Sequence, residues 1–338
     1  MKYEVQNPKD ELAASSPKKL WRLFLVGTGV YGVLFMGLLL LVWVHGPFTY
    51  LRLFITGTVL NSSRAYIAEW FLSPEQIREA SMLNGWDTVS VEPVITDKDL
   101  SFEDEANGLR IETIQGRHFK GKVMLVADPT QVRVAVTAEM GVAGQRLAQM
   151  VEQEGGIAGV NAGGFYDPDS QGNGAYPEGV TILHSRIVHN STPDRLNDII
   201  GLTKEGKLLL GYLGAEEAVE AGIEQAVTFS PFLLLDGQPK IAGDGGWGLA
   251  PRTGIGQRPD GTLILVVIDG RNPGWSMGAT LRDLMNVFIE YGALNAANLD
   301  GGSSTEMVYL GQTVNRLWNI FGSRYMATAF VVMPKEPS

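Results

Sequence analysis

The chain has 338 residues, of which 45% are hydrophobic and 19% are charged, and its formal net charge is -10 at pH 7. This length and composition fit one large domain or two small ones with an ample core, and they exclude a disordered chain. The absence of Cys excludes disulfides, zinc–thiolate sites and a thiol nucleophile, but it leaves the compartment open. The acidic balance argues against nucleic acid or anionic lipid as the main partner.

An uncharged, apolar segment at residues 23–44 is the first feature along the chain. As a helix it would be about 33 Å long at ~1.5 Å per residue, enough to cross a bilayer. Lys18, Lys19 and Arg22 precede it, so the positive-inside rule predicts a cytoplasmic tail at 1–22 and a membrane-spanning helix at 23–45. A cleaved signal peptide is the alternative, but no small-x-small cleavage site follows. We therefore expect a single-pass cell-membrane protein whose C-terminal part lies outside the cytoplasm.

Residues 46–105 are predicted to form a juxtamembrane helical stalk and a linker. Arg52 and Arg64 leave too short an uncharged stretch for a second crossing. The segment Ser73 to Gln76 has the form of a helix-capping box with Pro at the first helical position. A polar, acidic stretch follows, so the folded domain is expected at 106–335.

This domain is predicted to be an α+β fold with a mixed β-sheet and a few packed helices, because it has many strand-like segments and few helical ones. The segment 280–292 is the better predicted helix, since Thr280 and Asp283 suit a capping box and Gly292 suits the position after the last turn. The other predicted helix is 144–155. The predicted strands are 122–128, 132–138, 156–162, 179–183, 232–236, 263–269 and 327–333.

Several short motifs match known sites but stand in the wrong context. The G-x-G-x-x-G pattern at 27–32 lies inside the predicted membrane helix, and the one at 243–248 is not followed by a helix. The segment 116–123 resembles a phosphate-binding P-loop, but Val123 replaces the Ser or Thr that would bind magnesium. We expect no nucleotide site at any of them.

Two further motifs are weighed more closely. Gly274 to Gly278 fits the G-x-S-x-G nucleophile elbow of α/β-hydrolases, where His must follow Ser, yet all four His precede Ser276. A convergent triad in another chain order stays open. The loop Asp167 to Glu178 has acidic residues and a Gly at calcium-loop positions, but a strand-like segment follows it where a helix is needed. An exposed turn-rich loop is the simpler interpretation, and no metal or other cofactor is expected.

What remains is a set of polar fragments at the ends of strands. In chain order they are Asn161-Ala162-Gly163-Gly164-Phe165, Arg252-Thr253-Gly254-Ile255-Gly256, Asp269-Gly270-Arg271, Asn298-Leu299-Asp300-Gly301-Gly302-Ser303-Ser304, and Arg324. In these fragments the chain resembles the phosphodiester glycosidases related to the lysosomal uncovering enzyme, over roughly residues 110–334. Where the family's usual form has three glycines after the aspartate, this chain has two glycines and Ser303 after Asp300.

The chemistry that the resemblance implies gives these residues roles. Cleavage of a sugar-1-phosphodiester at the anomeric carbon expels an anionic phosphate monoester and needs a carboxylate facing the developing oxocarbenium ion. Asp300 and Asp269 are the candidate carboxylates, and Glu178 is a weaker candidate for proton transfer. The predicted substrate and phosphate ligands are Arg252, Thr253, Arg271, Arg324, Asn161, Gly301, Gly302, Ser303 and Ser304, because guanidinium groups, hydroxyls and glycine amides bind phosphate well.

We therefore predict an extracytoplasmic, membrane-anchored hydrolase that cleaves a sugar-1-phosphodiester, with cell-envelope glycans as its substrates. A non-catalytic glycan-binding or polysaccharide-assembly protein of the envelope is the alternative. The sequence leaves the sugar, the leaving alcohol and the oligomeric state undetermined.

Overall fold

The computed structural model describes residues 17–45, 102, 106–167, 172–319 and 321–335. The chain separates into two compact units, Met1–Arg52 and Leu53–Ser338. In the first unit a helix, α1, extends over Pro17–His45. The predicted stalk and linker, apart from Phe102, and the predicted capping box at Ser73 lie outside the described residues.

The membrane-spanning helix predicted at 23–45 is not confirmed. Helix α1 covers this segment but begins earlier, at Pro17, so Lys18, Lys19 and Arg22 belong to the helix rather than to a tail before it. Among the helices of the described residues, none is sufficiently long and apolar to cross a membrane.

The second unit contains short strands and few helices, which confirms the α+β class. The helices are α4 Leu147–Gln153, α5 Ala215–Glu220 and α6 Leu281–Glu290, with 3-10 turns η2 Ala106–Gly108, η3 Pro129–Gln131 and η5 Gly302–Ser304. The strands are β1 Leu109–Gln115, β2 Lys120–Val126, β3 Val132–Val136, β4 Ala158–Asn161, β5 Val180–Leu183, β6 Arg186–Asn190, β7 Asn197–Thr203, β8 Leu208–Leu213, β9 Ile223–Thr228, β10 Phe232–Leu235, β11 Gln238–Pro239, β12 Arg252–Gln257, β13 Leu263–Ile268, β14 Asn295–Leu299, β15 Met307–Tyr309, β16 Gln312–Thr313 and β17 Thr328–Val332.

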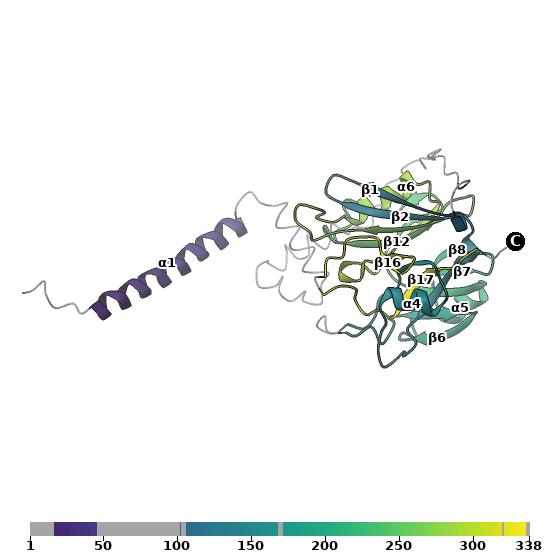
Figure 1. Ribbon diagram of the computed structural model, residues 1–338, viewed down its shortest axis with the longest axis horizontal. Coiled ribbons are helices and arrows are strands. Elements are labelled where there is room, and N and C mark those ends of the chain that lie inside the picture. Colours follow the sequence, from purple (N-terminus) through teal and green to yellow (C-terminus); the bar gives the residue numbers. More distant parts are fainter. Residues whose placement is uncertain (1–16, 46–101, 103–105, 168–171, 320, 336–338) are drawn as a thin grey trace, which may run out of the picture. The chain divides into compact units, whose positions relative to one another are not determined.

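These strands form three sheets (Figure 1). The largest has the order β1-β2-β13-β12-β14-β10-β11, the second β16-β15-β4-β17-β3 and the third β6-β5-β9-β7-β8. The strand pairs within the described residues are all antiparallel, so the prediction of a mixed sheet is wrong in strand direction. Each strand and helix predicted within 106–335 is present, with its ends shifted by a few residues.

The core lies on both faces of the largest sheet. On one face, residues from all three sheets pack together, including Met124, Leu265, Phe330 and Val160. On the other face, α6 packs against β12, β14 and β10, and side chains such as Leu284 belong to one apolar cluster with residues of β13 and β2. Strands β12 and β13 are buried along their whole length, as expected for strands covered on both sides.

Glycines in β12 set how closely α6 approaches this sheet. A Cβ atom at Gly254 would lie 2.8 Å from the Phe288 ring, and one at Gly256 would lie 2.7 Å from it. Side chains at these two positions would therefore push the helix away from the sheet. The first turn of α6 is closed by the predicted capping box, in which Thr280 and Asp283 hydrogen-bond to each other's backbone N–H groups.

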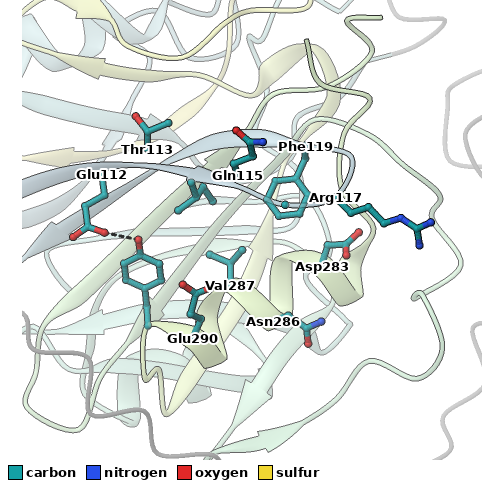
Figure 2. A pocket seen from close by; sticks show the side chains of 12 residues that line it. Glu112, Thr113, Gln115, Arg117, Phe119, Asp283, Asn286, Val287 and Glu290 are labelled. Atoms are coloured by element: carbon teal, nitrogen blue, oxygen red, sulfur yellow. Dashed lines mark hydrogen bonds between the residues drawn. The ribbon is translucent and has the colours of Figure 1, made fainter. Parts of the chain in front are cut away.

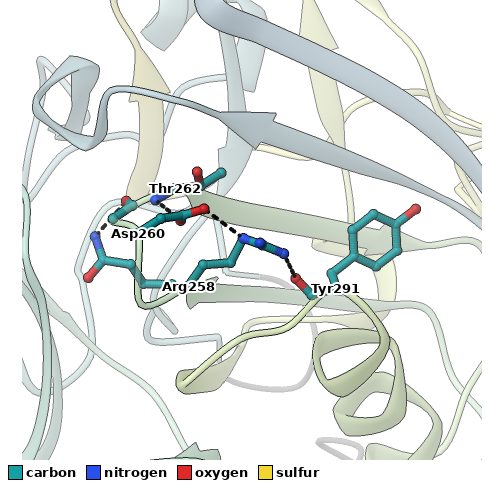
Figure 3. Close-up of polar contacts among 6 residues, drawn as sticks. Arg258, Asp260, Thr262 and Tyr291 are labelled. Atoms are coloured by element: carbon teal, nitrogen blue, oxygen red, sulfur yellow. Dashed lines mark hydrogen bonds and ion pairs between the residues drawn. The ribbon is translucent and has the colours of Figure 1, made fainter. Parts of the chain in front are cut away.

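The turn between β12 and β13 also fixes the C-terminal end of α6 (Figure 3). The Arg258 guanidinium donates from Nε to Asp260, at 3.1 Å, and from Nη1 to the carbonyl oxygen of Tyr291, at 2.9 Å. Asp260 in turn accepts from the backbone N–H of Thr262. A cation at the last carbonyls of a helix is favourable, so this turn holds the sheet and the helix in one arrangement.

Candidate functional site

The ends of four strands meet at one edge of the domain. Arg252 begins β12 and lies opposite Ile268 at the end of β13, while Thr253 lies opposite Leu299 at the end of β14. Asn161 ends β4 in the second sheet. Antiparallel pairing thus brings the starts and ends of neighbouring strands together, and the polar residues of the predicted site follow from these four ends.

Asn161 connects the two sheets at this edge. Its Nδ2 donates to the carbonyl oxygen of Asp300 at 2.5 Å, and its Oδ1 accepts from Thr253 Oγ1 at 2.8 Å and from the backbone N–H of Glu306 at 3.1 Å. Asn161 and Thr253 are buried, at 1% and 0% exposure. They were predicted as substrate ligands, but these hydrogen bonds make them the framework that holds Asp300.

Asp300 follows β14, and its backbone is fixed by a hydrogen bond from its N–H to Ala162. Burial raises the pKa of its carboxyl group to about 6, and nearby Asp167 adds to this effect, whereas a Ser304 hydrogen bond, the Arg324 charge and the Gly301 N–H oppose it. Groups that stabilise the carboxylate therefore surround it, but desolvation has the largest effect on the pKa of Asp300 and raises it. A carboxyl group with such a perturbed pKa is typical of a functional site.

The segment after Asp300 forms a tight turn. Gly302 has a left-handed backbone (φ 60°), and its N–H donates to the Pro251 carbonyl oxygen at 2.9 Å. A Cβ at Gly301 would lie 2.8 Å from that same oxygen. Both glycines are thus needed for the close approach of this turn to the start of β12.

Arg324 lies over this turn. Its Nη1 donates to Ser303 Oγ at 2.9 Å, its Nη2 forms an ion pair with Asp167, and its guanidinium stacks on the Phe165 ring, 4.8 Å from the ring centre. Ser303 and Arg324 are therefore brought together as predicted. Asp167 occupies one side of the guanidinium.

Arg271 reaches the same turn from the end of β13. An added Cβ at Gly302 would lie 3.7 Å from Arg271 Nη1. The guanidinium stacks on Trp318, 5.1 Å from the ring centre, while its buried Nε has no hydrogen-bond partner among the described residues. Burial lowers the pKa of Arg271, and its backbone is left-handed (φ 55°). A strained, half-buried cation that pairs with no carboxylate of the described residues indicates a place for an anion.

Arg252 is nearby but is more deeply embedded. Its Nε donates to the carbonyl oxygen of Ala279, and its Nη2 donates to those of Trp247 and Gly248. Burial, followed by the charge of Arg271, lowers the pKa of Arg252 to about 9. Arg252 therefore organises the loops around β12, and its recorded hydrogen bonds within the described residues leave Nη1 unused.

Asp269 does not face the site as a free carboxylate. It is buried, and it accepts hydrogen bonds from Trp275 Nε1 at 2.8 Å, from the Arg316 N–H at 2.9 Å and from Asn315 Nδ2 at 3.2 Å. Its position after a strand suggested catalysis. The structure instead shows a side chain that ties together the two loops carrying Arg271 and Trp318.

Glu178 is exposed, and its backbone N–H donates to the Gly164 carbonyl oxygen at 2.9 Å. Its Oε2 would lie 3.1 Å from a Cβ at Gly164. No recorded hydrogen bond joins it to the Asp300 group within the described residues, so the structure does not bring it into that group.

Glu306 was missed by sequence reasoning. This carboxylate is only 2% exposed and accepts from Thr313 Oγ1 at 2.7 Å and from Ser323 Oγ at 2.5 Å. Ser323 precedes Arg324, so Glu306 fixes the segment that carries this arginine. The only signal in the sequence is a charged residue between Thr305 and the apolar β15, which is too weak to identify such a role.

The other predicted motifs fall outside the site. Ser276 is buried and donates to the Asp269 carbonyl oxygen at 2.5 Å, so it serves the loop and not as a nucleophile. In the calcium-like loop, residues 168–171 lie outside the described part, and Asp167 pairs with Arg324. Within the described residues, no group of three or more acidic or His side chains could hold a metal ion.

A pocket of about 340 Å³ lies elsewhere, between β1 and α6 (Figure 2). Two of its three carboxylates serve the fold, because Glu112 accepts from the Tyr291 hydroxyl at 2.6 Å and Asp283 caps α6. None of the residues predicted for catalysis or phosphate binding lines this pocket. We therefore assign the functional site to the Asp300 turn and its arginines.

Comparison with known proteins agrees with this fold. The family of phosphodiester glycosidases matches residues 154–333, which is more than half of the chain, and the chain belongs to this family. The catalytic domain of zebrafish N-acetylglucosamine-1-phosphodiester alpha-N-acetylglucosaminidase, auto-inhibited by its pro-peptide, has a similar fold. Its TM-score is 0.56 at 22% identity, covering 67% of this chain and 82% of that one.

Two further relatives carry no activity in their names. A hypothetical protein from Synechocystis has a TM-score of 0.54 at 16% identity, covering 68% of this chain and 62% of that one. The SPbeta prophage-derived uncharacterized protein YomE of Bacillus subtilis is 34% identical over 107 residues, or 30% of this chain. The match spans 16% of the length of that relative.

Proposed function

We propose that the domain hydrolyses a sugar-1-phosphodiester by breaking the bond between the anomeric carbon and the phosphate oxygen. Membership of the phosphodiester glycosidase family supports this proposal. The observation that carries it is Arg271, a half-buried cation that lies against the Asp300 turn and whose Nε has no hydrogen-bond partner among the described residues. A bound phosphate would supply the missing acceptor and the missing negative charge.

In this proposal, the phosphate lies between Arg271 and Arg324, with Ser303 donating a hydrogen bond to it. The phosphate competes with Asp167 for the Arg324 guanidinium, since both are anions. Arg252 adds positive charge from behind the turn. As the bond to the anomeric carbon breaks, its electron pair leaves with the phosphate monoester, whose charge these cations stabilise.

Asp300 supplies the carboxylate that faces the anomeric carbon. It stabilises the oxocarbenium-like transition state or attacks it, after which water adds to the carbon and its proton passes to a carboxylate. Burial raises the pKa of Asp300 to about 6. The carboxyl group is therefore ionised at neutral pH, but its ionised form destabilises the folded protein. Charge that develops on the sugar would recover that free energy in the transition state.

The direct test is incubation of the purified full-length protein with the methyl diester of N-acetylglucosamine-1-phosphate. We expect equal amounts of reducing sugar and methyl phosphate, and we expect Arg271→Gln to abolish their release. Binding of the diester without turnover would instead support the alternative of a glycan-binding protein.

We also propose that the domain acts outside the cytoplasm, on cell-envelope glycans. This proposal rests on the sequence alone: the uncharged segment at 23–44 follows Lys18, Lys19 and Arg22. A reporter fused after Ser338 should be active only on the outer side of the membrane. Activity of the reporter in the cytoplasm would contradict it.

A further inference from the structure

A second group of cations lies beside the proposed phosphate site and takes no part in the chemistry described above. Lys120 Nζ lies 4.1 Å from the ring centre of Trp275, and the Arg316 guanidinium lies 5.5 Å from it. Trp275 is 40% exposed, and Arg316 is exposed as well. We call Lys120, Trp275 and Arg316 the basic ledge.

The side-chain cations of the ledge have no ion-pair partner in the part of the chain that the structure describes, since no carboxylate there pairs with Lys120 or Arg316. The chain as a whole carries a net charge of -10. Two cations on one ring therefore contrast with the negative net charge of the chain. A single cation over an aromatic ring is common, whereas here two cations, Lys120 and Arg316, contact the same indole.

The ledge is held rigidly. Trp275 Nε1 and the Arg316 N–H both donate to the Asp269 carboxylate, at 2.8 and 2.9 Å. The backbone of Trp275 is closed in a turn onto Asn272, at 3.0 Å. Stacking on the indole also restricts the two long side chains. A cation that is already in place loses less entropy when it binds an anion.

The ledge continues the proposed phosphate site. Arg271 follows Asp269 by two residues, and its stacking partner Trp318 follows Arg316 by two residues. Two residues span roughly 7 Å of extended chain. The Arg271–Trp318 stack and the ledge are therefore carried by the same two loops, with their residues at most two positions apart at 269–271 and at 316–318.

We propose that the basic ledge is a subsite for a second phosphate, carried by the leaving group of the substrate. This inference rests on the proposed hydrolysis and narrows its substrate class to sugar-1-phosphodiesters whose alcohol bears a further phosphate. A phosphate fits better than a single hydroxyl or a sugar face, because its several oxygens can accept from the ammonium of Lys120 and from the fork of Arg316 together.

The test uses two synthetic substrates that differ only in the second phosphate. One is N-acetylglucosamine-1-phosphate esterified to glycerol, and the other is the same diester with a terminal phosphate on the glycerol. They are given to the wild-type full-length protein, to the double variant Lys120→Gln/Arg316→Gln, and to the control Lys204→Gln/Arg133→Gln. Both control residues are exposed: Arg133 lies on β3, and Lys204 lies on the turn after β7. The control changes the net charge equally, and melting curves confirm folding.

The ledge variant is expected to lose at least ~10-fold in kcat/KM on the phosphorylated substrate, because it removes charge-assisted hydrogen bonds to the second phosphate. On the other substrate, which has no second phosphate, it should lose less than ~2-fold. The control should keep both activities. An equal loss on both substrates, or the same loss in the control, would overturn the subsite.

Binding separates this inference from the proposed reaction. Calorimetry with glycerol-1,3-bisphosphate and glycerol-1-phosphate should show tighter binding of the bisphosphate to the wild-type protein, and the ledge variant should lose that difference. If the wild-type protein cleaves neither diester, the proposed hydrolysis fails while the binding result still decides the subsite. Equal affinities for the two phosphates would refute it.

Discussion

Replacing Asp300 with Asn should remove activity and increase stability at the same time. The substitution keeps the shape of the side chain but removes the charge that we place opposite the oxocarbenium ion. We expect kcat to fall by at least ~100-fold, which is about 2.7 kcal/mol of transition-state stabilisation, with little change in KM.

The stability change follows from the pKa of Asp300, which burial raises from 3.8 to about 6. A carboxyl group whose pKa is raised by folding stabilises the protein fully when protonated, below about pH 4, and this contribution is lost as the pH rises towards 6. At 1.36 kcal/mol per pKa unit, the ionised group costs about 3 kcal/mol above that range. Asn has no charge to desolvate. The variant should therefore be more stable by up to about 3 kcal/mol at pH 8 and of equal stability at pH 4, by the same linkage.

Urea denaturation of both proteins at pH 4 and pH 8 measures this difference, and kinetics on the methyl diester measures the activity. Asp269→Asn is the matched control. An amide there turns an N–H group towards a donor such as Trp275 Nε1, so this variant should lose about 1–3 kcal/mol of stability. A folded Asp300→Asn protein that turns over at the wild-type rate, or one that is less stable at pH 8, would refute the reasoning.

The remaining predictions concern the groups around Asp300. If the ionised form of Asp300 is the active one, kcat/KM should rise with pH through about 6 and then stay level. A profile that falls across this range would contradict this role of the carboxylate. Arg252→Lys should lower kcat/KM and also the melting temperature, because it loses bonds to three carbonyl groups, whereas Arg271→Lys should lower kcat/KM with little effect on melting. Ser323→Ala leaves a buried Glu306 oxygen without its donor, and we expect a loss of about 1–3 kcal/mol together with a higher KM; an unchanged KM would separate Glu306 from Arg324. Activity should survive EDTA, and recovery by calcium alone after its loss would assign a role to the loop at Asp167.

The sequence was most informative where local chemistry and burial agree. The strand β13 is a continuous apolar run, and α6 has both an apolar stripe and a capping box, so both were predicted with nearly their observed bounds. Strand β12 was not predicted, because Gly254 and Gly256 lower strand propensity and are explained only by the Phe288 ring packed against them. Its packing depends on a helix that lies far away in the sequence.

The same limit applies to the site. Arg324 and Ser303 were predicted together and do hydrogen-bond, since the motif places both near the same turn. Asp269 was predicted as a catalytic carboxylate and Asn161 as a substrate ligand. Their hydrogen-bond partners, Arg316 and Glu306, come from other parts of the chain and could not be assigned from sequence spacing. Side-chain direction at a strand end depends on tertiary contacts, which a single sequence does not provide.

Cleavage in oxygen-18-labelled water tests the central claim most directly. If the domain breaks the bond between the anomeric carbon and the oxygen, mass spectrometry of the products should find the label in the released sugar and none in the methyl phosphate. Label in the phosphate would mean attack at phosphorus, and it would contradict the assignment of Asp300 to the anomeric carbon and of Arg271 and Arg324 to the leaving phosphate.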